Sequence, residues 1–284
     1  MSRIVYVNGD YVPEEEAKIS VFDRGFLFAD AVYEVTSVLG GRLVDFAGHL
    51  ARLHRSLGEL GMAPPLDDAG IEAMHRELVA RNAVDEGMVY IQVTRGAADR
   101  DFAWPKAAAP GFVGFTQERP LADTASGRDG IRVVSVPDIR WGRRDIKTVQ
   151  LLAPSWCKMM AKAAGKDDAW MVEDGLVTEG TSNNAYIVTR DGAIVTRDLS
   201  PAILSGITRA AVLRIAAEAQ LRVEERAFTV EEAQAAAEAF MTAASAFVTP
   251  VVEIDGRPVG DGRPGPVTRR LRELYIAEAR ARAT

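Results

Sequence analysis

Four pairs of an asparagine or aspartate followed by a glycine interrupt β-rich runs, and they restrict the fold more than any other feature. They are Asn8-Gly9, Asp174-Gly175, Asp191-Gly192 and Asp255-Gly256. Such pairs tolerate the left-handed backbone of tight turns, so each one predicts a turn between adjacent strands. Helical segments lie between these strand pairs without a regular strand–helix–strand rhythm. The pattern predicts an α+β protein without internal repeats.

The stretch "ERPLADTASGRDG", from Glu118 to Gly130, is rich in proline, glycine and small polar residues. This composition is typical of a linker. A chain of 284 residues can also bury two separate cores. We therefore expect a smaller N-terminal α/β domain over residues 1–119, a linker over 120–126 and a larger C-terminal domain over 127–284.

The apolar periodicity predicts several helices. Residues 45–61 carry a leucine stripe with Arg52 on its polar border, and residues 67–81 form a second helix. Thr148 to Ala164 is expected to be helical, and Ser205 is expected to cap the amphipathic helix that follows it. Shorter helices are expected after Thr229 and from about Val267.

Composition excludes several classes of function. The net charge of −6 and the pI near 5.3 argue against a nucleic-acid or anionic membrane surface. One cysteine excludes an internal disulfide, and three histidines without ligand spacing predict no metal site. The start "MSRIVYVNGDYV" favours a strand and turn over a signal peptide. We expect a cytoplasmic protein.

Lysine is rare in this chain, because only six of the 34 basic residues are lysines. Lys158, Lys162 and Lys166 follow one another at intervals of four, as on a solvated helix face. Lys147 differs, since apolar residues surround it in "DIRWGRRDIKTVQLL". A lysine in such a place either belongs to a structural ion pair or supplies an amine for chemistry.

Other segments carry groups that could bind a ligand. Glu179 ends a strand in "VTEGTSNNA", and "SGITR" places Gly206 at a helix N-terminus, where an anion can bind. Arg52 could reach a phosphate, and Arg95 and Arg100 in "VTRGAADRDF" could clamp a carboxylate. Each feature also has an ordinary structural explanation, as a turn, a capped helix or a solvated arginine.

Together these segments resemble one family. Tyr33 in "FADAVYEV", Arg52 in "HLARLHRS", Lys147 in "DIKTVQLL", Glu179 in "TEGTSNNAYIV" and the text "LSGITR" follow the order and spacing of the fold-type IV pyridoxal-phosphate (PLP) enzymes. The stretch around Lys147 is most similar to D-amino-acid transaminases. The resemblance covers nearly the whole chain, so it implies the two-domain fold of class IV aminotransferases, with the PLP lysine in the larger C-terminal domain.

The resemblance also implies a role for each site residue. Lys147 would form a Schiff base with PLP and move a proton, and Glu179 would bind the pyridine nitrogen. The phosphate and ring would be held by Arg52, Leu204, Gly206, Ile207, Thr208, Ala243 and Ala244. Tyr33, Arg100 and Phe102 would face the substrate. A homodimer is expected, because in this family the partner subunit closes the active site.

Two positions depart from the family pattern. Phe102 stands where D-amino-acid transaminases usually have a histidine in the carboxylate loop, which removes one donor to the substrate. The change either alters packing alone or widens specificity toward apolar amines. Ala243 and Ala244 stand where relatives often carry hydroxyl groups near the phosphate, and Thr242 or Ser245 could substitute for these.

We therefore expect a PLP-dependent transaminase that moves the amino group of a D-amino acid to a 2-oxo acid such as 2-oxoglutarate or pyruvate. An (R)-selective amine transaminase is the first alternative. A branched-chain L-amino-acid transaminase or an aminodeoxychorismate lyase comes next. A noncatalytic PLP carrier is the alternative of a different class, and the combination of Lys147, Glu179 and Arg52 argues against it.

Overall fold

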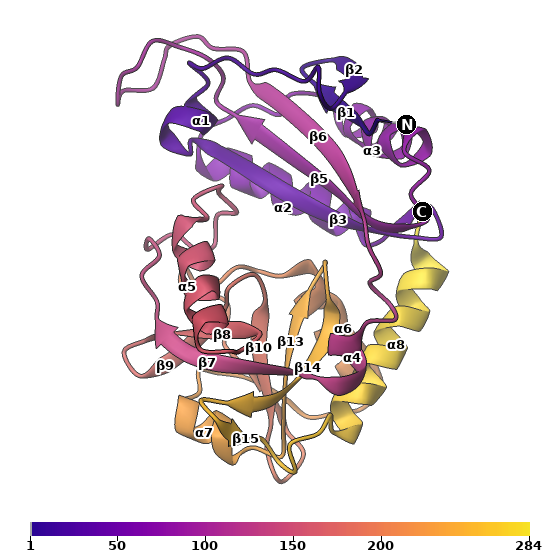
Figure 1. Ribbon diagram of the computed structural model, residues 1–284, viewed down its shortest axis with the longest axis vertical. Coiled ribbons are helices and arrows are strands. Elements are labelled where there is room, and N and C mark those ends of the chain that lie inside the picture. The colour runs from indigo at the N-terminus through magenta and orange to yellow at the C-terminus, as the bar shows by residue number, and fades with distance from the viewer. Residues whose placement is uncertain (1) are drawn as a thin grey trace. The chain divides into compact units, whose positions relative to one another are not determined.

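The computed structural model describes residues 2–284, which form two compact units (Figure 1). Unit 1 consists of residues up to Pro120 together with Ile146–Gln150 and Ala279–Thr284, and unit 2 consists of Leu121–Asp145 and Leu151–Glu278. The first boundary falls at the expected linker. The remaining boundaries differ from the expected domains 1–119 and 127–284. The segment that carries Lys147 belongs to unit 1, because it hydrogen-bonds to a strand of that unit.

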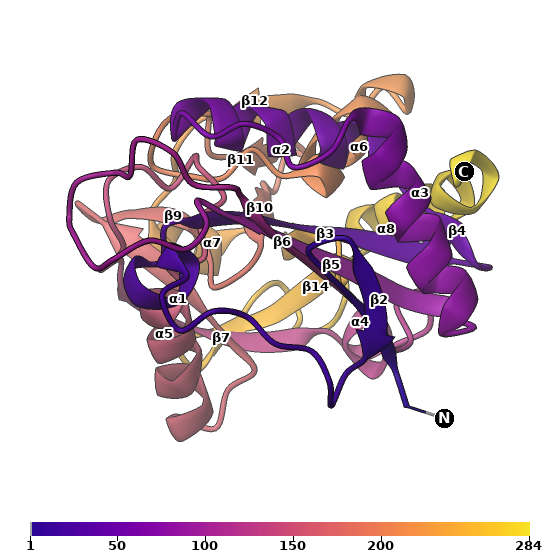
Figure 2. The same cartoon turned by 90° about the horizontal axis from the view of Figure 1, so that it is seen from above.

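Unit 1 contains one antiparallel sheet of six strands in the order β2-β1-β6-β5-β3-β4. The strands are β1 Ile4–Val7, β2 Asp10–Pro13, β3 Ala31–Leu39, β4 Arg42–Leu43, β5 Glu86–Thr94 and β6 Gly111–Glu118. The helices are α1 Arg24–Phe28, α2 Phe46–Glu59 and α3 Asp68–Arg81. Helices α2 and α3 lie on one side of the sheet (Figure 2), where their leucines and methionines form the core with strand valines and isoleucines.

Strand β3 places neighbouring residues on opposite faces of this sheet. It pairs with β5 over nine consecutive residues, from Ala31 opposite Thr94 to Leu39 opposite Glu86. Because side chains alternate along a strand, Glu34 is buried on the helix side while Tyr33 is partly exposed on the other. The register of β3 therefore decides which groups reach each face.

Unit 2 contains a mixed sheet in the order β12-β11-β10-β13-β14-β7-β8-β9, with β15 paired to β14. Its strands are β7 Ile131–Pro137, β8 Asp168–Glu173, β9 Leu176–Gly180, β10 Asn184–Val188, β11 Ile194–Thr196, β12 Val223–Glu225, β13 Glu238–Ala243, β14 Phe247–Ile254 and β15 Arg257–Pro258. The helices are α4 Ala125–Asp129, α5 Leu152–Ala163, α6 Ile207–Glu218, α7 Val230–Ala235 and α8 Pro266–Arg282. Trp170 and Phe228 lie in the core of this unit.

The four Asx-Gly turns are confirmed, since strands flank each pair and the glycines have positive φ. Thr229 caps α7 as expected. Two details differ from expectation. Helix α5 begins at Leu152, because Thr148 forms a bridge with Val32 instead of a helical turn. Gly206, and not Ser205, is the N-cap of α6, and no side chain caps this helix.

Among residues 2–284, no helix has the length and apolar character needed to cross a membrane. The same residues contain no group of three or more His, Cys, Asp or Glu side chains that could hold a metal ion.

His75 lies fully buried in α3, and this makes the stability of the protein dependent on pH. Its Nδ1 donates to the carbonyl of Ile71 at 2.8 Å, and burial lowers its pKa from 6.5 to about 4. The unfolded chain therefore binds a proton at pH values where the folded chain does not, so stability is lost as the pH falls from about 6.5 toward 4. The expected loss is about 3 kcal/mol.

The measurement is urea unfolding at several pH values for the parent and for His75→Gln. Between about pH 4 and 6.5, the free energy of unfolding of the variant should depend less steeply on pH, by about one bound proton. His54→Gln is the matched control, because the imidazole of His54 is partly exposed and contacts Asp68. Equal slopes for the parent and the His75 variant would contradict the prediction.

Candidate active site

The segment Ile146–Gln150 runs beside the start of β3 within unit 1. The amide of Tyr33 donates to the carbonyl of Lys147 at 3.0 Å, and the amide of Val149 donates to the carbonyl of Ala31 at 3.1 Å. The amide of Lys147 also donates to Ser56 Oγ at 3.3 Å. These bonds fix the backbone of Lys147 against both β3 and α2.

The side chain of Lys147 lies over an aromatic ring. Its Nζ is 4.0 Å from the centroid of the Tyr33 ring, and Tyr33 stacks in turn on Tyr90 with centroids 5.5 Å apart. Within the described residues of unit 1, Nζ pairs with no carboxylate. The structural ion pair that the sequence left open is therefore not formed in this unit, and the Tyr33 ring is the observed neighbour of the amino group.

Arg52 is held by a buried carboxylate that the sequence interpretation missed. Its Nε and Nη2 donate to Glu34 Oε1 and Oε2 at 2.7 and 2.8 Å, and His49 Nδ1 lies 2.8 Å from Oε2. Burial alone would raise the pKa of Glu34. The charge of Arg52 and the hydrogen bonds from Arg52 and His49 outweigh burial and lower the pKa of Glu34 to about 2. The bidentate contact thus fixes the direction of the Arg52 side chain.

Arg100 and Phe102 lie on an exposed loop between β5 and β6. The Phe102 ring is 80% exposed and contacts Phe28 edge-on with centroids 5.6 Å apart. The guanidinium of Arg100 lies near both rings, at 5.3 Å from Phe28 and 5.6 Å from Phe102. Arg24 holds this loop, because its Nη1 donates to the carbonyl of Asp101 at 2.6 Å.

Arg95 and Arg143, two other arginines that could meet a substrate carboxylate, have carboxylate partners of their own. Arg95 is buried and donates from Nε to Asp30 at 2.7 Å, and it also stacks over the Trp104 ring at 3.9 Å. Arg143 donates from Nε and Nη2 to Asp145, each at 3.0 Å. Arg100 forms no ion pair with the described residues of unit 1.

In unit 2, Glu179 is almost completely buried at the end of β9 and accepts three hydrogen bonds. Arg140 Nη1 donates to Oε1, while Asn184 Nδ2 and the amide of Leu204 each donate to Oε2 at 3.1 Å. Burial raises the pKa of Glu179, and the charge of Arg140 acts in the opposite direction. We call this group the glutamate cluster, which consists of Glu179, Arg140, Asp138, Asn184 and Leu204.

Helix α6 begins beside the glutamate cluster. Asn184 Nδ2 also donates to the carbonyl of Leu204 at 2.9 Å, which ties β10 to the loop that enters the helix. A Cβ at Gly206 would lie only 2.1 Å from Asn184 Oδ1, so the entry of the helix requires a glycine. Ile207 and Thr208 then form the first turn, whose amides point away from the helix without a side-chain cap.

Ala243 is the last residue of β13, where it pairs with Phe247, and Ala244 begins the turn to β14. The nearby hydroxyl of Thr242 lies in the sheet and contacts the hydroxyl of Tyr186 at 3.1 Å. Thr242 thus has a hydrogen-bond partner within the sheet of unit 2.

Comparison with protein families gives a direct result. The model of the family described as "Amino-transferase class IV" matches residues 31–254. The chain belongs to the class IV aminotransferases. The D-alanine aminotransferase of Staphylococcus aureus (strain MSSA476) is 38% identical over 274 residues, which cover 95% of this chain and 96% of that protein. The D-alanine aminotransferase of Bacillus licheniformis is 37% identical over 269 residues and 94% of each chain.

Solved class IV aminotransferase structures have the same fold. The T.th. branched-chain amino acid aminotransferase complexed with N-(5'-phosphopyridoxyl)-L-glutamate has a TM-score of 0.90 and 29% identity, with 99% of this chain and 95% of that chain covered. The Escherichia coli branched-chain enzyme, 22% identical, supports the fold alone at the same TM-score, with 98% and 94% covered. The expected α+β fold, the enzyme class and the PLP cofactor are confirmed.

The donor set of this aminotransferase fits PLP. Lys147 offers a primary amine that is not engaged by a carboxylate of its unit, and Glu179 is a buried carboxylate with a strong cation beside it. The start of α6 offers amides with no capping side chain, which suits a phosphate. Lys147 and Arg52 belong to unit 1, whereas Glu179 and the start of α6 belong to unit 2.

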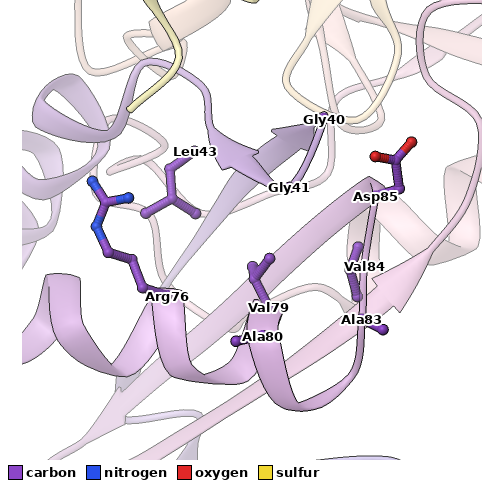
Figure 3. Close-up of a pocket in the computed structure, with 9 residues that line it drawn as sticks. All are labelled: Gly40, Gly41, Leu43, Arg76, Val79, Ala80, Ala83, Val84 and Asp85. Atoms are coloured by element: carbon purple, nitrogen blue, oxygen red, sulfur yellow. The ribbon is translucent and has the colours of Figure 1, made fainter.

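A hollow of about 360 Å³ in unit 1 lies away from these residues. It opens beside the turn after β3 (Figure 3), and strand β3 separates it from Tyr33 by about seven residues, or roughly 23 Å. Its lining residues are Gly40, Gly41, Leu43, Arg76, Val79, Ala80, Ala83, Val84 and Asp85. Arg76 contacts Glu72 on the helix surface.

Glu34, His49 and Arg140 are the important neighbours that the sequence interpretation missed. A weak signal existed for each of them. Glu34 interrupts an otherwise apolar strand in "VYEV", and a carboxylate in such a place needs a buried partner. His49 precedes Arg52 by one helical turn, and Arg140 lies within the stretch that the comparison with D-amino-acid transaminases rests on.

Proposed function

We propose that this class IV aminotransferase moves the amino group of a D-amino acid to a 2-oxo acid such as 2-oxoglutarate or pyruvate. The observation that carries the proposal is the similarity to D-alanine aminotransferases over 95% of the chain. PLP, when bound, supplies a ring that withdraws electrons from the α-carbon of the substrate. The protein must then bind the cofactor, orient the substrate and move one proton.

Lys147 and Arg52 would perform two of these tasks from unit 1. The amine of Lys147 would bind the cofactor carbonyl and then move the proton at the substrate α-carbon. Arg52 would bind the phosphate through its guanidinium, whose direction Glu34 fixes.

The residues of unit 2 would bind the rest of the cofactor. Glu179 would accept a hydrogen bond from the pyridine nitrogen, which favours the protonated ring. Leu204 would pack on the ring, and Gly206 with the amides of Ile207 and Thr208 would hold the phosphate at the start of α6. The turn at Ala243 and Ala244 would add backbone contacts without side-chain hydroxyls.

An (R)-selective amine transaminase is the second candidate, because Phe102 presents an exposed aromatic ring beside Arg100. The visible absorption of the PLP-loaded enzyme separates the two candidates. We expect D-alanine, and not L-alanine, to convert the band of the lysine-bound cofactor into that of its amine form. Conversion by an (R)-arylalkylamine alone would reject the D-amino-acid proposal.

Arg100 is expected to bind the substrate carboxylate, together with Tyr33. Replacement by leucine should lower kcat/KM for D-alanine roughly 10- to 100-fold, because a charge-assisted hydrogen bond is lost. The rate with an (R)-arylalkylamine, which has no carboxylate, should change little. Steady-state kinetics of Arg100→Leu and Arg143→Leu with both donors check this. A selective loss in the Arg143 variant instead would contradict the assignment.

The active enzyme is further proposed to be a homodimer. Helix α5 exposes an apolar face, with Leu152 80%, Trp156 62% and Met159 65% exposed. An apolar face of this kind is typical of protein interfaces. Light scattering of the purified protein at micromolar concentration tests the dimer, and a monomer that remains fully active would contradict it.

A further inference from the structure

Arg140 lies between two carboxylates of the glutamate cluster. Its Nε and Nη2 donate to Asp138 Oδ1 and Oδ2 at 3.0 and 2.7 Å, and its Nη1 donates to Glu179 Oε1. The Asp138 side chain is completely buried and also accepts a hydrogen bond from Thr178 at 2.7 Å. Asp138 therefore fixes the plane of the guanidinium, and Nη1 is the nitrogen that donates to Glu179.

The acceptor positions of Glu179 are nearly filled by the protein. An ionised carboxylate has about four acceptor positions. Asn184 and Leu204 occupy both positions of Oε2, and Arg140 occupies one position of Oε1. One acceptor position thus remains, on the same oxygen that Arg140 contacts. Arg140 is consequently the cation that contacts the oxygen to which a further N–H donor would bind.

We propose that Arg140 is a positioning residue that keeps Glu179 ionised and aims its last acceptor position at the ring nitrogen of PLP. The inference rests on the proposed role of Glu179 and extends it to a residue that does not itself touch the cofactor. A buried glutamate without a cation would take up a proton. The protonated acid would no longer stabilise a protonated pyridine nitrogen, so the ring would withdraw electrons less strongly.

Arg144 provides the matched control. It is buried in the same group of charges, where its Nη1 lies 3.4 Å from Asp138 Oδ2, and Nη1 and Nη2 donate to Glu173 at 2.8 and 2.6 Å. Among the described residues, no hydrogen bond or ion pair joins Arg144 to Glu179. Removal of Arg144 therefore disturbs the same charge network without changing the donor to Glu179.

The experiment measures the dissociation constants of the apoenzyme, prepared from the PLP-loaded enzyme, for two ligands. One is PLP, and the other is its carbocyclic analogue, in which a C–H group replaces the ring nitrogen. We expect Arg140→Gln to weaken PLP binding about 10- to 100-fold and to leave the affinity for the analogue within about threefold. Glu179→Gln should show the same selectivity, and Arg144→Gln should show none.

Equal weakening of both ligands in Arg140→Gln, or no weakening of either, would overturn the inference. If circular dichroism shows that Arg140→Gln does not fold, Arg140→Lys replaces it. This variant keeps the charge but lacks the planar guanidinium that contacts both carboxylates, so it should lose PLP affinity selectively by a smaller factor; an unselective loss would again overturn the inference. If the parent binds neither ligand, the proposed function itself fails. Selectivity in Glu179→Gln without selectivity in either Arg140 variant would reject only the role of Arg140.

Discussion

Replacement of Lys147 by alanine is expected to lower the transamination rate at least about 10⁴-fold, as is usual when a nucleophile that also transfers the proton is removed. Its primary amine is the group that would bind the cofactor carbonyl, and the neighbouring Tyr33 ring offers no replacement for it. The visible band of the lysine-bound cofactor should be lost at the same time. Single-turnover kinetics with D-alanine and the absorption spectrum measure the two effects.

Two further variants test whether the loss of activity is caused by the loss of the amine. Lys147→Arg keeps a cation beside Tyr33 but cannot form an imine, so it should be as inactive as the alanine variant. Lys162→Ala removes an exposed lysine at the end of α5 and should retain the parent rate. Transamination by Lys147→Ala at the parent rate would reject the entire proposed site.

Replacement of Glu34 by glutamine is expected to destabilise the protein by about 3 kcal/mol, because it leaves the buried Arg52 guanidinium without its counter-charge. The lowered pKa leads to the same magnitude. A shift from 4.5 to about 2 contributes stability that is complete above pH 4.5 and is lost as the pH falls toward 2. The shift corresponds to about 3 kcal/mol. Urea unfolding at neutral pH measures the change.

A double variant separates packing from cofactor binding. Glu34→Met combined with Arg52→Met removes both charges and should recover part of the stability that Glu34→Gln loses, since no unpaired buried charge remains. It should not recover PLP affinity, because the proposed phosphate ligand is absent. Parent-like stability of Glu34→Gln would show that the contacts of Arg52 and Glu34 are energetically unimportant.

Local sequence signals were sufficient for most elements of the fold. The Asx-Gly pairs located the turns, and Thr229 located the start of α7. The sequence patterns gave the wrong prediction where contacts between residues far apart in the sequence outweighed the local preference for a helix. Thr148 lies in an apolar run that favours a helix, yet it forms a bridge with Val32, so α5 starts only at Leu152. No periodicity within the run could have shown that pairing.

The family pattern in the sequence predicted the candidate site residues themselves. It did not predict the side chains that hold them in place. Arg52 and Glu34 are 18 residues apart, and Arg140 and Glu179 are 39 residues apart. The first pair forms only when a helix packs on a strand, and the second only when strands align in a sheet. Side-chain periodicity predicts neither of these contacts. The expected cap at Ser205 failed for a related reason, because Asn184 fixes the entry of α6 from another strand.

The chain passes between its two units four times, after Pro120, Asp145, Gln150 and Glu278. A fragment that ends in the linker would therefore lack residues 146–150, and the Tyr33 amide and the Ala31 carbonyl of β3 would lose their hydrogen-bond partners. Unit 1 therefore cannot be produced as one continuous fragment of the chain. Two fragments divided at Pro120 would restore the reactive lysine only by complementation, when residues 146–150 of the second fragment hydrogen-bond to β3 of the first.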